Sequence, residues 1–297
     1  MNRLLIGDNA FIGVSHLSQS HAREKIAKLD VETIVEVIEE AILCGASGFT
    51  FSTHPNNFEI LRALADAAPR SSGFELYPVL PYAEGYVRLT NERGTIGLLR
   101  EILSKLRLSA KTQALIKGGI SAIRLDPFGM LGAYVDMELA SYLSIKPENA
   151  RVEAVLLHEV VTDLGISFHT RSLFDYFMEH IRDSYHVKPG FVTRNFVLFA
   201  KFFDNEGLSL KDVMIMTPFN RAGFQMNPSR ESCETCLSHL SGGNVLAMSI
   251  MAGGYLNLDD AVQYLGTLPE LSGAVAGVSS KQHARETFSK LGALRQR

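Results

Sequence analysis

Residues 244–288, NVLAMSIMAGGYLNLDDAVQYLGTLPELSGAVAGVSSKQHARETF, decide the fold of this chain. Their hydrophobic pattern predicts an alternation of strand and helix: a strand at 244–250, a Gly-Gly turn, a helix at 258–266, a strand at 273–278 and a helix at 281–291. Strands that alternate with helices of this length are typical of βαβ units, which build a parallel sheet.

The same alternation continues back to the start of the chain. Further strands are predicted at 3–7, 48–51, 74–79, 152–157, 190–193 and 212–217, with helices at about 31–43, 57–67, 169–182, 196–205 and after 229. A (β/α)8 barrel takes about 250 residues, so 297 residues fit one barrel with insertions. The predicted fold is therefore α/β, a single-domain (β/α)8 TIM barrel over residues 1–297, with a helical insertion at about 108–150 between its third and fourth strands.

Composition limits the classes of function. A net charge of −3 argues against a broad nucleic-acid interface, which needs a clustered basic face. No apolar run is long enough to span a membrane, and the first residues do not have the pattern of a signal peptide. The three cysteines are too few for a disulfide framework, so we expect a cytoplasmic protein. A small-molecule substrate is expected, and a homo-oligomer is left open.

Polar residues gather where the predicted strands end, although the strand interiors are apolar. These residues are Asp8, Asn9, His54, His158, Glu159, Arg194, Asn195, Asn220 and Ser279. In barrel enzymes the carboxyl ends of the strands surround the active site. Because such residues follow six of the eight predicted strands, we expect them to form a catalytic mouth.

The residue types suggest acid/base chemistry or a metal. His54 and His158 could each act as acid, base or metal ligand. Together with Asp8, Glu159 and His16 they could bind a divalent ion such as Zn, Mn or Fe, although no short ligand motif such as HExxH occurs.

Anion binding is predicted at two places. Arg194 could act as an anion clamp, with Asn9, Asn195 and Asn220 as further binding residues. The stretch Gly277-Val278-Ser279-Ser280 ends a strand and begins a helix, where free N–H groups and the helix dipole favour a phosphate. Alternatively, Ser279 or Ser280 simply caps the last helix.

Cys233-Glu234-Thr235-Cys236 is similar to a redox or zinc motif. It lies within the helix predicted after residue 229, however, and no second cysteine pair completes a site. We therefore interpret these cysteines as small residues on a half-buried helix.

The carboxyl-terminal half resembles the aldo-keto reductase barrel in the order of its motifs. The motifs are LLHE at 156–159, GFVTRN at 190–195, VMIMTPFN at 213–220, VLAMSIMAGG at 245–254 and GVSSKQHARETF at 277–288. The resemblance implies a (β/α)8 barrel, NAD(P)H as cofactor near the last strand and helix, with Lys281 and Arg285 toward its phosphates, and His158 in place of the family's histidine.

Other family positions differ. Where the family has Asp-Thr-Ala and then Tyr, this chain has Ser52-Thr53-His54, and the segment Leu76-Tyr77-Pro78-Val79 contains no Lys. The sequence alone therefore favours acid/base or metal-assisted non-redox chemistry, as a lyase, isomerase or hydrolase, on a small polar, anionic or phosphorylated substrate. The alternatives are an NAD(P)H-dependent oxidoreductase with an atypical site, using His158 or Tyr82 as its acid, and a non-catalytic ligand-binding barrel.

Overall fold

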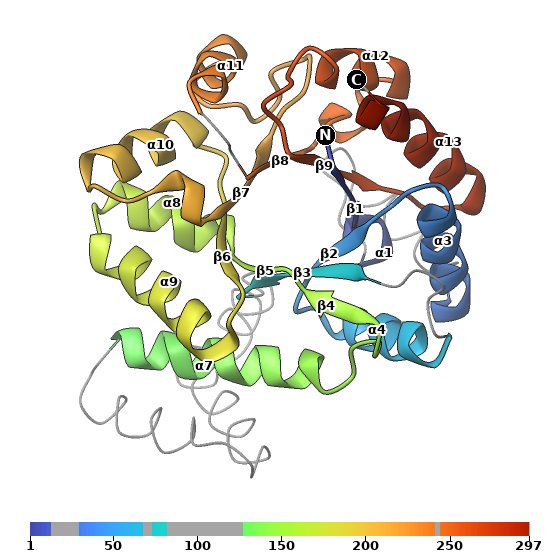
Figure 1. Ribbon diagram of the computed structural model, residues 1–297, viewed down its shortest axis with the longest axis horizontal. Coiled ribbons are helices and arrows are strands. Elements are labelled where there is room, and N and C mark those ends of the chain that lie inside the picture. The colour runs from blue at the N-terminus through green and yellow to red at the C-terminus, as the bar shows by residue number, and fades with distance from the viewer. Residues whose placement is uncertain (13–29, 68–72, 82–126, 241–243, 297) are drawn as a thin grey trace, which may run out of the picture.

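Nine parallel strands form a closed ring in the computed structural model of the chain (Figure 1). The structure describes residues 1–12, 30–67, 73–81, 127–240 and 244–296. The strands are β1 Arg3–Gly7, β2 Gly48–Ser52, β3 Phe74–Leu80, β4 Ala150–Val152, β5 Ala154–Leu157, β6 Lys188–Val192, β7 Met214–Pro218, β8 Val245–Met248 and β9 Gly273–Gly277. Both β4 and β5 pair with β3, so together they make the fourth of eight positions around the barrel.

The ring closes where the last strand pairs with the first. β9 runs beside β1 in register from Arg3 opposite Gly273 to Gly7 opposite Gly277, and β2 pairs with both β1 and β3. Consecutive strands are thus neighbours throughout, as in a (β/α)8 barrel. The predicted fold class is confirmed.

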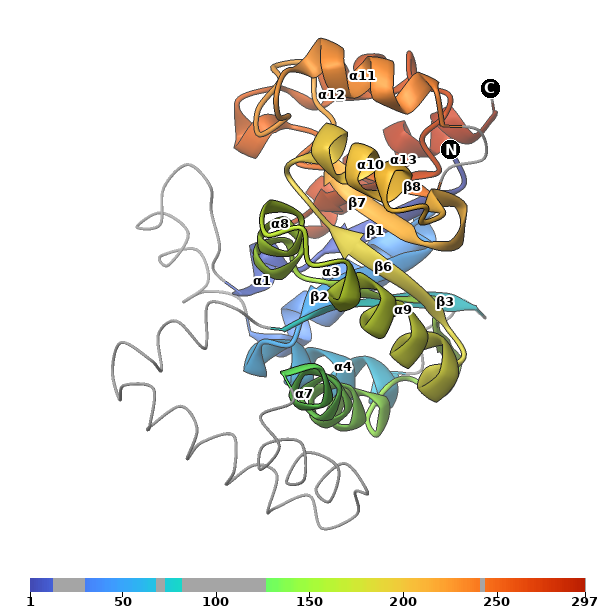
Figure 2. The same cartoon turned by 90° about the vertical axis from the view of Figure 1, so that its left-hand side faces the viewer.

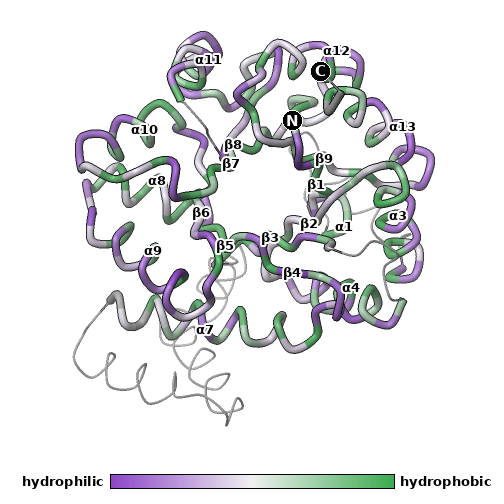
Figure 3. Tube along the Cα trace, viewed as in Figure 1, coloured by the Kyte–Doolittle hydropathy of each residue, from purple (hydrophilic) through white to green (hydrophobic). Residues whose placement is uncertain are grey.

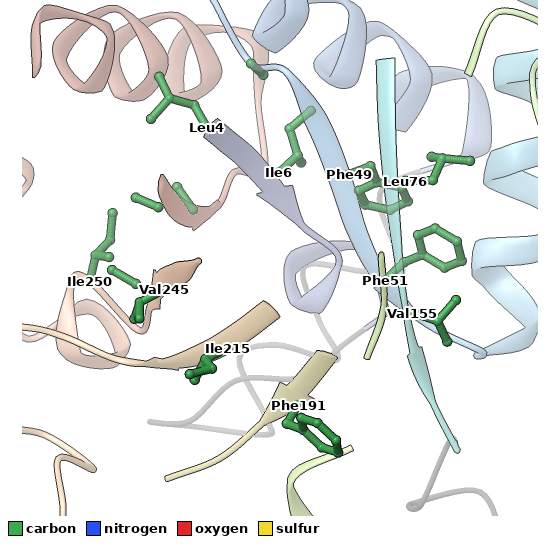
Figure 4. Close-up of a cluster of buried hydrophobic side chains, with 14 of the residues drawn as sticks. Leu4, Ile6, Phe49, Phe51, Leu76, Val155, Phe191, Ile215, Val245 and Ile250 are labelled. Carbon is green, nitrogen blue, oxygen red and sulfur yellow. The ribbon is translucent and has the colours of Figure 1, made fainter. Parts of the chain in front are cut away.

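Alternate residues of each strand face opposite sides of the barrel wall. On β1, Leu5 belongs to the cluster inside the barrel, whereas Leu4 and Ile6 belong to the larger cluster between strands and helices. Figure 4 shows this outer cluster. The inner cluster also includes Met214 and Met216, so these methionines fill the core as predicted.

Helices cover the outside of the ring (Figure 1). They are α1 Asn9–Ile12, α3 Val31–Leu43, α4 Pro55–Ala67, α7 Pro127–Leu143, α8 Glu159–Ser167, α9 Arg171–Tyr185, α10 Phe196–Asn205, α11 Arg230–Ser238, α12 Leu258–Leu265 and α13 Lys281–Gly292. Figure 3 shows hydrophobic and hydrophilic residues alternating along these helices. On α9 the buried residues Phe174, Phe177, Met178 and Ile181 follow helical spacing. No described helix has the length and apolar character needed to cross a bilayer.

Most predicted elements are present, with shifted ends. The helices predicted at 31–43 and 196–205 match α3 and α10. The fourth strand is interrupted at Glu153, and residues 210–212 form a 3-10 turn ahead of β7. Of the predicted insertion at about 108–150, the structure describes α7 and the start of β4; the residues before 127 lie outside the described ranges.

Helix α8 was not predicted. Its sequence, EVVTDLGIS, contains three adjacent β-branched residues and a glycine, and it leaves Val160 and Leu164 exposed, so no amphipathic pattern marks it. A Cβ on Gly165 would lie 2.7 Å from the Leu173 side chain and 3.1 Å from that of Phe174, so this glycine allows α8 to pack closely on α9.

The two ends of the barrel differ. Figure 2 shows α1 and α8 at one end and both chain termini at the other. At the end near the termini, Arg3 pairs with Glu153 at 3.0 Å, Arg151 pairs with Glu75 at 2.8 Å, and the Tyr77 hydroxyl donates to Glu75 at 2.6 Å. Ion pairs thus occupy the end near the termini. The opposite end, where the strands finish and α1 and α8 begin, is the mouth of the barrel.

We predict that Gly273→Ala destabilises the protein by about 1–3 kcal/mol, because overpacking at a strand contact forces the backbone to move. A Cβ at Gly273 would lie 2.3 Å from the Arg3 carbonyl oxygen. Gly292→Ala is the matched control, because a Cβ there meets nothing within 4 Å. Urea unfolding measures both; equal stability of the two variants would contradict the close β1–β9 contact.

Candidate functional site

A cavity of about 420 Å³ opens at the carboxyl ends of the strands. Its deeper wall is apolar, with Val79, Val192 and Met216 from inside the barrel. Its rim is polar. The polar side chains that line it are Asp8, Asn9, Thr50, Ser52, His158, Glu159, Arg194, Gln225 and Ser249. An apolar pocket with a few converging polar groups is the usual form of a small-molecule site.

Asp8 is the most constrained of these residues. It follows β1, is 8% exposed, and accepts three hydrogen bonds on Oδ2. The Ser52 amide and hydroxyl donate at 2.8 Å each, and Asn57 Nδ2 donates at 2.7 Å. Burial raises the pKa of Asp8, because removing the carboxylate from water outweighs the lowering by these hydrogen bonds.

His158 and His54 both cap helices, but only one of them lines the cavity. His158 Nδ1 accepts the Val160 N–H at 3.2 Å at the start of α8, and His158 is part of the cavity wall. His54 Nδ1 accepts the Asn56 N–H at 3.0 Å in the first turn of α4, outside the cavity wall. In the described structure His158 is thus part of the cavity wall and His54 lies outside it, and a catalytic role for either histidine stays a prediction.

Arg194 and Glu159 form an ion pair on the rim, between the end of β6 and the start of α8. Arg194 Nε is buried and has no hydrogen-bond partner among the described residues. Glu159 thus binds one end of the Arg194 guanidinium group, and the role of Arg194 as an anion clamp stays a prediction.

Asp163 on α8 holds the backbone beneath this pair. It accepts hydrogen bonds from the Thr193 hydroxyl at 2.5 Å and from Asn195 Nδ2 at 2.9 Å. Burial raises the pKa of Asp163, and these donors lower it in part. Asn195 therefore orders the β6–α10 turn and does not line the cavity, contrary to its predicted binding role.

Asn220 has a structural role as well. Its Nδ2 donates to the Phe224 carbonyl at 2.9 Å, and its Oδ1 accepts the Phe224 N–H at 2.8 Å. It is fully buried and lies outside the cavity wall. Its amide therefore closes the loop after β7, and its role in binding a ligand stays a prediction.

The last strand contributes Gly277 to the cavity wall but not the serines that follow. Ser280 Oγ accepts the His283 N–H at 3.2 Å, which is the simple capping alternative. Ser279 lies outside the cavity wall too. Lys281 pairs with Glu36 at 2.8 Å and Arg285 pairs with Glu40 at 2.9 Å, so both cations are directed toward α3. Of the four residues of this turn, which the sequence predicted to bind a phosphate, only Gly277 lines the cavity in the described structure.

The structure adds residues that sequence reasoning missed. Ser52 and Asn57 bind Asp8, and Asn57 reaches it from the first turn of α4, so no strand-end pattern marks it. Gln225 and Ser249 line the cavity with left-handed backbones, at φ 59° and 52°. Gln225 Oε1 is also buried without a hydrogen-bond partner in the described part of the chain. Strained backbone and unsatisfied polar atoms often mark functional sites.

The predicted metal site is not formed. Over the described ranges, no three His, Cys, Asp or Glu side chains come together to hold an ion. Asp8, Glu159 and the two histidines each have the other contacts given above, and His16 lies outside the described residues. Cys233 is buried on α11, where burial raises the pKa of its thiol to about 11, in keeping with a packing role.

The barrel is similar to solved structures of aldo-keto reductases. Two structures provisionally named as an aldo-keto reductase from Pseudomonas aeruginosa match with TM-scores of 0.59 and 0.58, at 13% identity, over 98% of this chain and 90% of each of those chains. A provisionally named 2,5-diketo-D-gluconic acid reductase B matches with a TM-score of 0.52, at 11% identity, over 99% of this chain and 86% of that one. No family model matches the sequence. No curated protein matches it either.

These likenesses establish an aldo-keto reductase-like (β/α)8 barrel. They also correct the functional expectation drawn from the sequence. The similar structures are named as reductases, which agrees with the alternative of an oxidoreductase and contradicts the preference for a lyase, isomerase or hydrolase.

We predict that Asp8→Asn raises the stability of the protein by about 1 kcal/mol or more at pH values above the folded-state pKa of Asp8, since there it removes a buried charge but keeps an acceptor for the three donors. A group whose pKa is raised on folding contributes stability at low pH and loses it as the pH rises through the folded-state pKa. The stability gain of Asp8→Asn should therefore grow with pH.

Thermal unfolding across a pH series tests this prediction. Asp30→Asn is the control, because Asp30 is an exposed helix cap whose pKa is lowered by its hydrogen bonds to Thr33. A gain that shrinks as the pH rises would contradict the buried, charge-disfavouring environment of Asp8.

Proposed function

We propose that this protein is an NAD(P)H-dependent reductase of small carbonyl compounds, with an active site that differs from the usual aldo-keto reductase arrangement. The observation that carries the proposal is the cavity at the carboxyl ends of an aldo-keto reductase-like barrel, lined by His158, Asp8 and Gly277. The three cysteines are unpaired, which supports the cytoplasmic location expected from the sequence.

The residues around Gly277 fit a cofactor. A Cβ built on Gly277 would meet only the Ala10 Cβ, at 4.0 Å, and its φ is not in the left-handed region. Neither packing nor backbone conformation therefore requires glycine there. Its missing side chain leaves space in the same cavity that Arg194 and Gln225 line, and Arg194 Nε and Gln225 Oε1 are buried without a hydrogen-bond partner among the described residues. When bound, the reduced nicotinamide would supply a hydride to the substrate.

His158 is suited to polarise a substrate carbonyl. Because its Nδ1 accepts the Val160 N–H, Nε2 is the ring nitrogen that would act as a hydrogen-bond donor. A neutral imidazole of this kind can donate a hydrogen bond to a carbonyl oxygen without carrying a charge. The apolar deeper wall, with Val79, Val192 and Met216, would exclude water from the reacting carbon.

We predict that the protein binds NADPH or NADH and that Gly277→Val weakens this binding by about tenfold or more, because the added side chain occupies the cavity. Fluorescence titration of the reduced cofactor measures the affinity. Gly292→Val on α13 is the control, since its position lies outside the cavity wall.

Folding should be preserved in Gly277→Val, with a stability change below about 1 kcal/mol, because valine suits a strand. If the wild-type protein binds neither reduced nicotinamide, the proposed function is excluded. If Gly277→Val binds as tightly as the wild type, the cofactor does not use this cavity.

A further inference from the structure

Reduction of a carbonyl group requires a proton donor as well as a hydride. The described titratable residues of the cavity wall are Asp8, His158, Glu159 and Arg194. The tyrosine and lysine with which aldo-keto reductases perform this step have no counterparts after β2 and β3. Within the described part of the chain, these four residues are the candidates for the donor, and Tyr82, named from the sequence, lies outside the described ranges.

Three of them are poorly suited to release a proton. His158 accepts the Val160 N–H on Nδ1, so a proton released from Nε2 would leave an imidazolate anion. The carboxylate of Glu159 is held in an ion pair with Arg194, and an arginine guanidinium does not deprotonate in proteins.

The two oxygens of Asp8 are not equivalent. Oδ2 accepts the Ser52 N–H at 2.8 Å and Asn57 Nδ2–H at 2.7 Å, and both of these groups can only donate. With the Ser52 hydroxyl also at 2.8 Å, the lone pairs of Oδ2 are occupied. All of these bonds end on Oδ2, so Oδ1 is the oxygen that can carry a proton at the cavity wall.

We propose that Asp8 is the proton donor of the reaction, acting through Oδ1, and that Ser52 and Asn57 are its positioning residues. This inference rests on the proposed reductase function. The carbonyl carbon gains the hydride and its oxygen gains the Asp8 proton, so the C=O double bond becomes an alcohol. The reduced nicotinamide is oxidised, and the Asp8 carboxylate regains a proton from water.

The surroundings of Asp8 support a protonated form. Burial raises its pKa. The charged and titratable groups that face it in the described structure are Tyr142 on α7, His158 and Glu159 at the start of α8, and Arg194 after β6. Burial, together with the negative charge of Glu138, raises the pKa of Tyr142, so this phenol stays neutral beside Asp8.

The first test uses the cofactor-free protein. Infrared difference spectra of wild type against Asp8→Asn should show the C=O stretch of a protonated carboxyl group that disappears as the pH is raised. Asp136→Asn is the matched control, because Asp136 is a half-buried carboxylate that contacts His180 and Tyr185 and lies outside the cavity wall. Its spectrum should leave the Asp8 band unchanged.

The second test follows NADPH oxidation by 4-nitrobenzaldehyde as a function of pH. The wild-type rate should fall at high pH as Asp8 ionises, and this fall is the alkaline limb of the pH–rate profile. Asp8→Asn should show no alkaline limb, and its kcat/KM should be lower by about 100-fold or more. Ser52→Ala should move the limb to higher pH, because the Ser52 hydroxyl lowers the pKa of Asp8. Asp136→Asn should retain the wild-type limb.

The outcomes separate the two levels of the proposal. If NADPH binds to the wild type and Asp8→Asn keeps both rate and limb within about threefold, the inference is overturned while the reductase function stands. The inference is also overturned if Tyr82→Phe loses the alkaline limb and Asp8→Asn keeps it. If Asp8→Asn does not fold, an alkaline limb at the wild-type pH in Ser52→Ala overturns the inference. Absence of nicotinamide binding overturns both levels.

Discussion

The pairing of β9 with β1 is the contact on which the rest of the structure depends. It joins the two ends of the sheet over five residue pairs, from Arg3 opposite Gly273 to Gly7 opposite Gly277. The approach is so close that a Cβ on Gly273 would overlap the Arg3 carbonyl. Because the ladder is in register, the ends of both strands, and with them Asp8 and Gly277, reach the same height at the mouth.

Closure also explains how a carboxylate can be buried at that mouth. A buried charge needs compensating hydrogen bonds, and the donors to Asp8 come from the neighbouring β2 and from α4, not from its own strand. Ser52 stands beside Asp8 because β2 pairs with β1 up to Gly7 opposite Thr50. The barrel thus brings together three groups that are up to 49 positions apart in sequence.

Sequence reasoning located the strands well because their interiors are apolar and their ends are polar. It could not tell which polar end residues turn inward. His54 and His158 both follow strands, yet His54 caps α4 beside the wall and His158 lies in it. Nor could it foresee partners: Glu36 and Glu40 on α3 engage Lys281 and Arg285, and Glu159 engages Arg194. Ion pairs between distant elements leave no local pattern.

The preference for non-redox chemistry arose from treating a family's catalytic residues as fixed to their strands. In a barrel, all the strand ends converge on one mouth, so a proton donor on one strand can occupy space near a donor on another. Here β2 ends in Ser52 and Asp8 follows β1, with Ser52 as its hydrogen-bond partner. Under the proposed reductase function, the missing tyrosine after β2 would remove one donor position, and Asp8, whose pKa is raised by burial, would supply the proton from the same mouth.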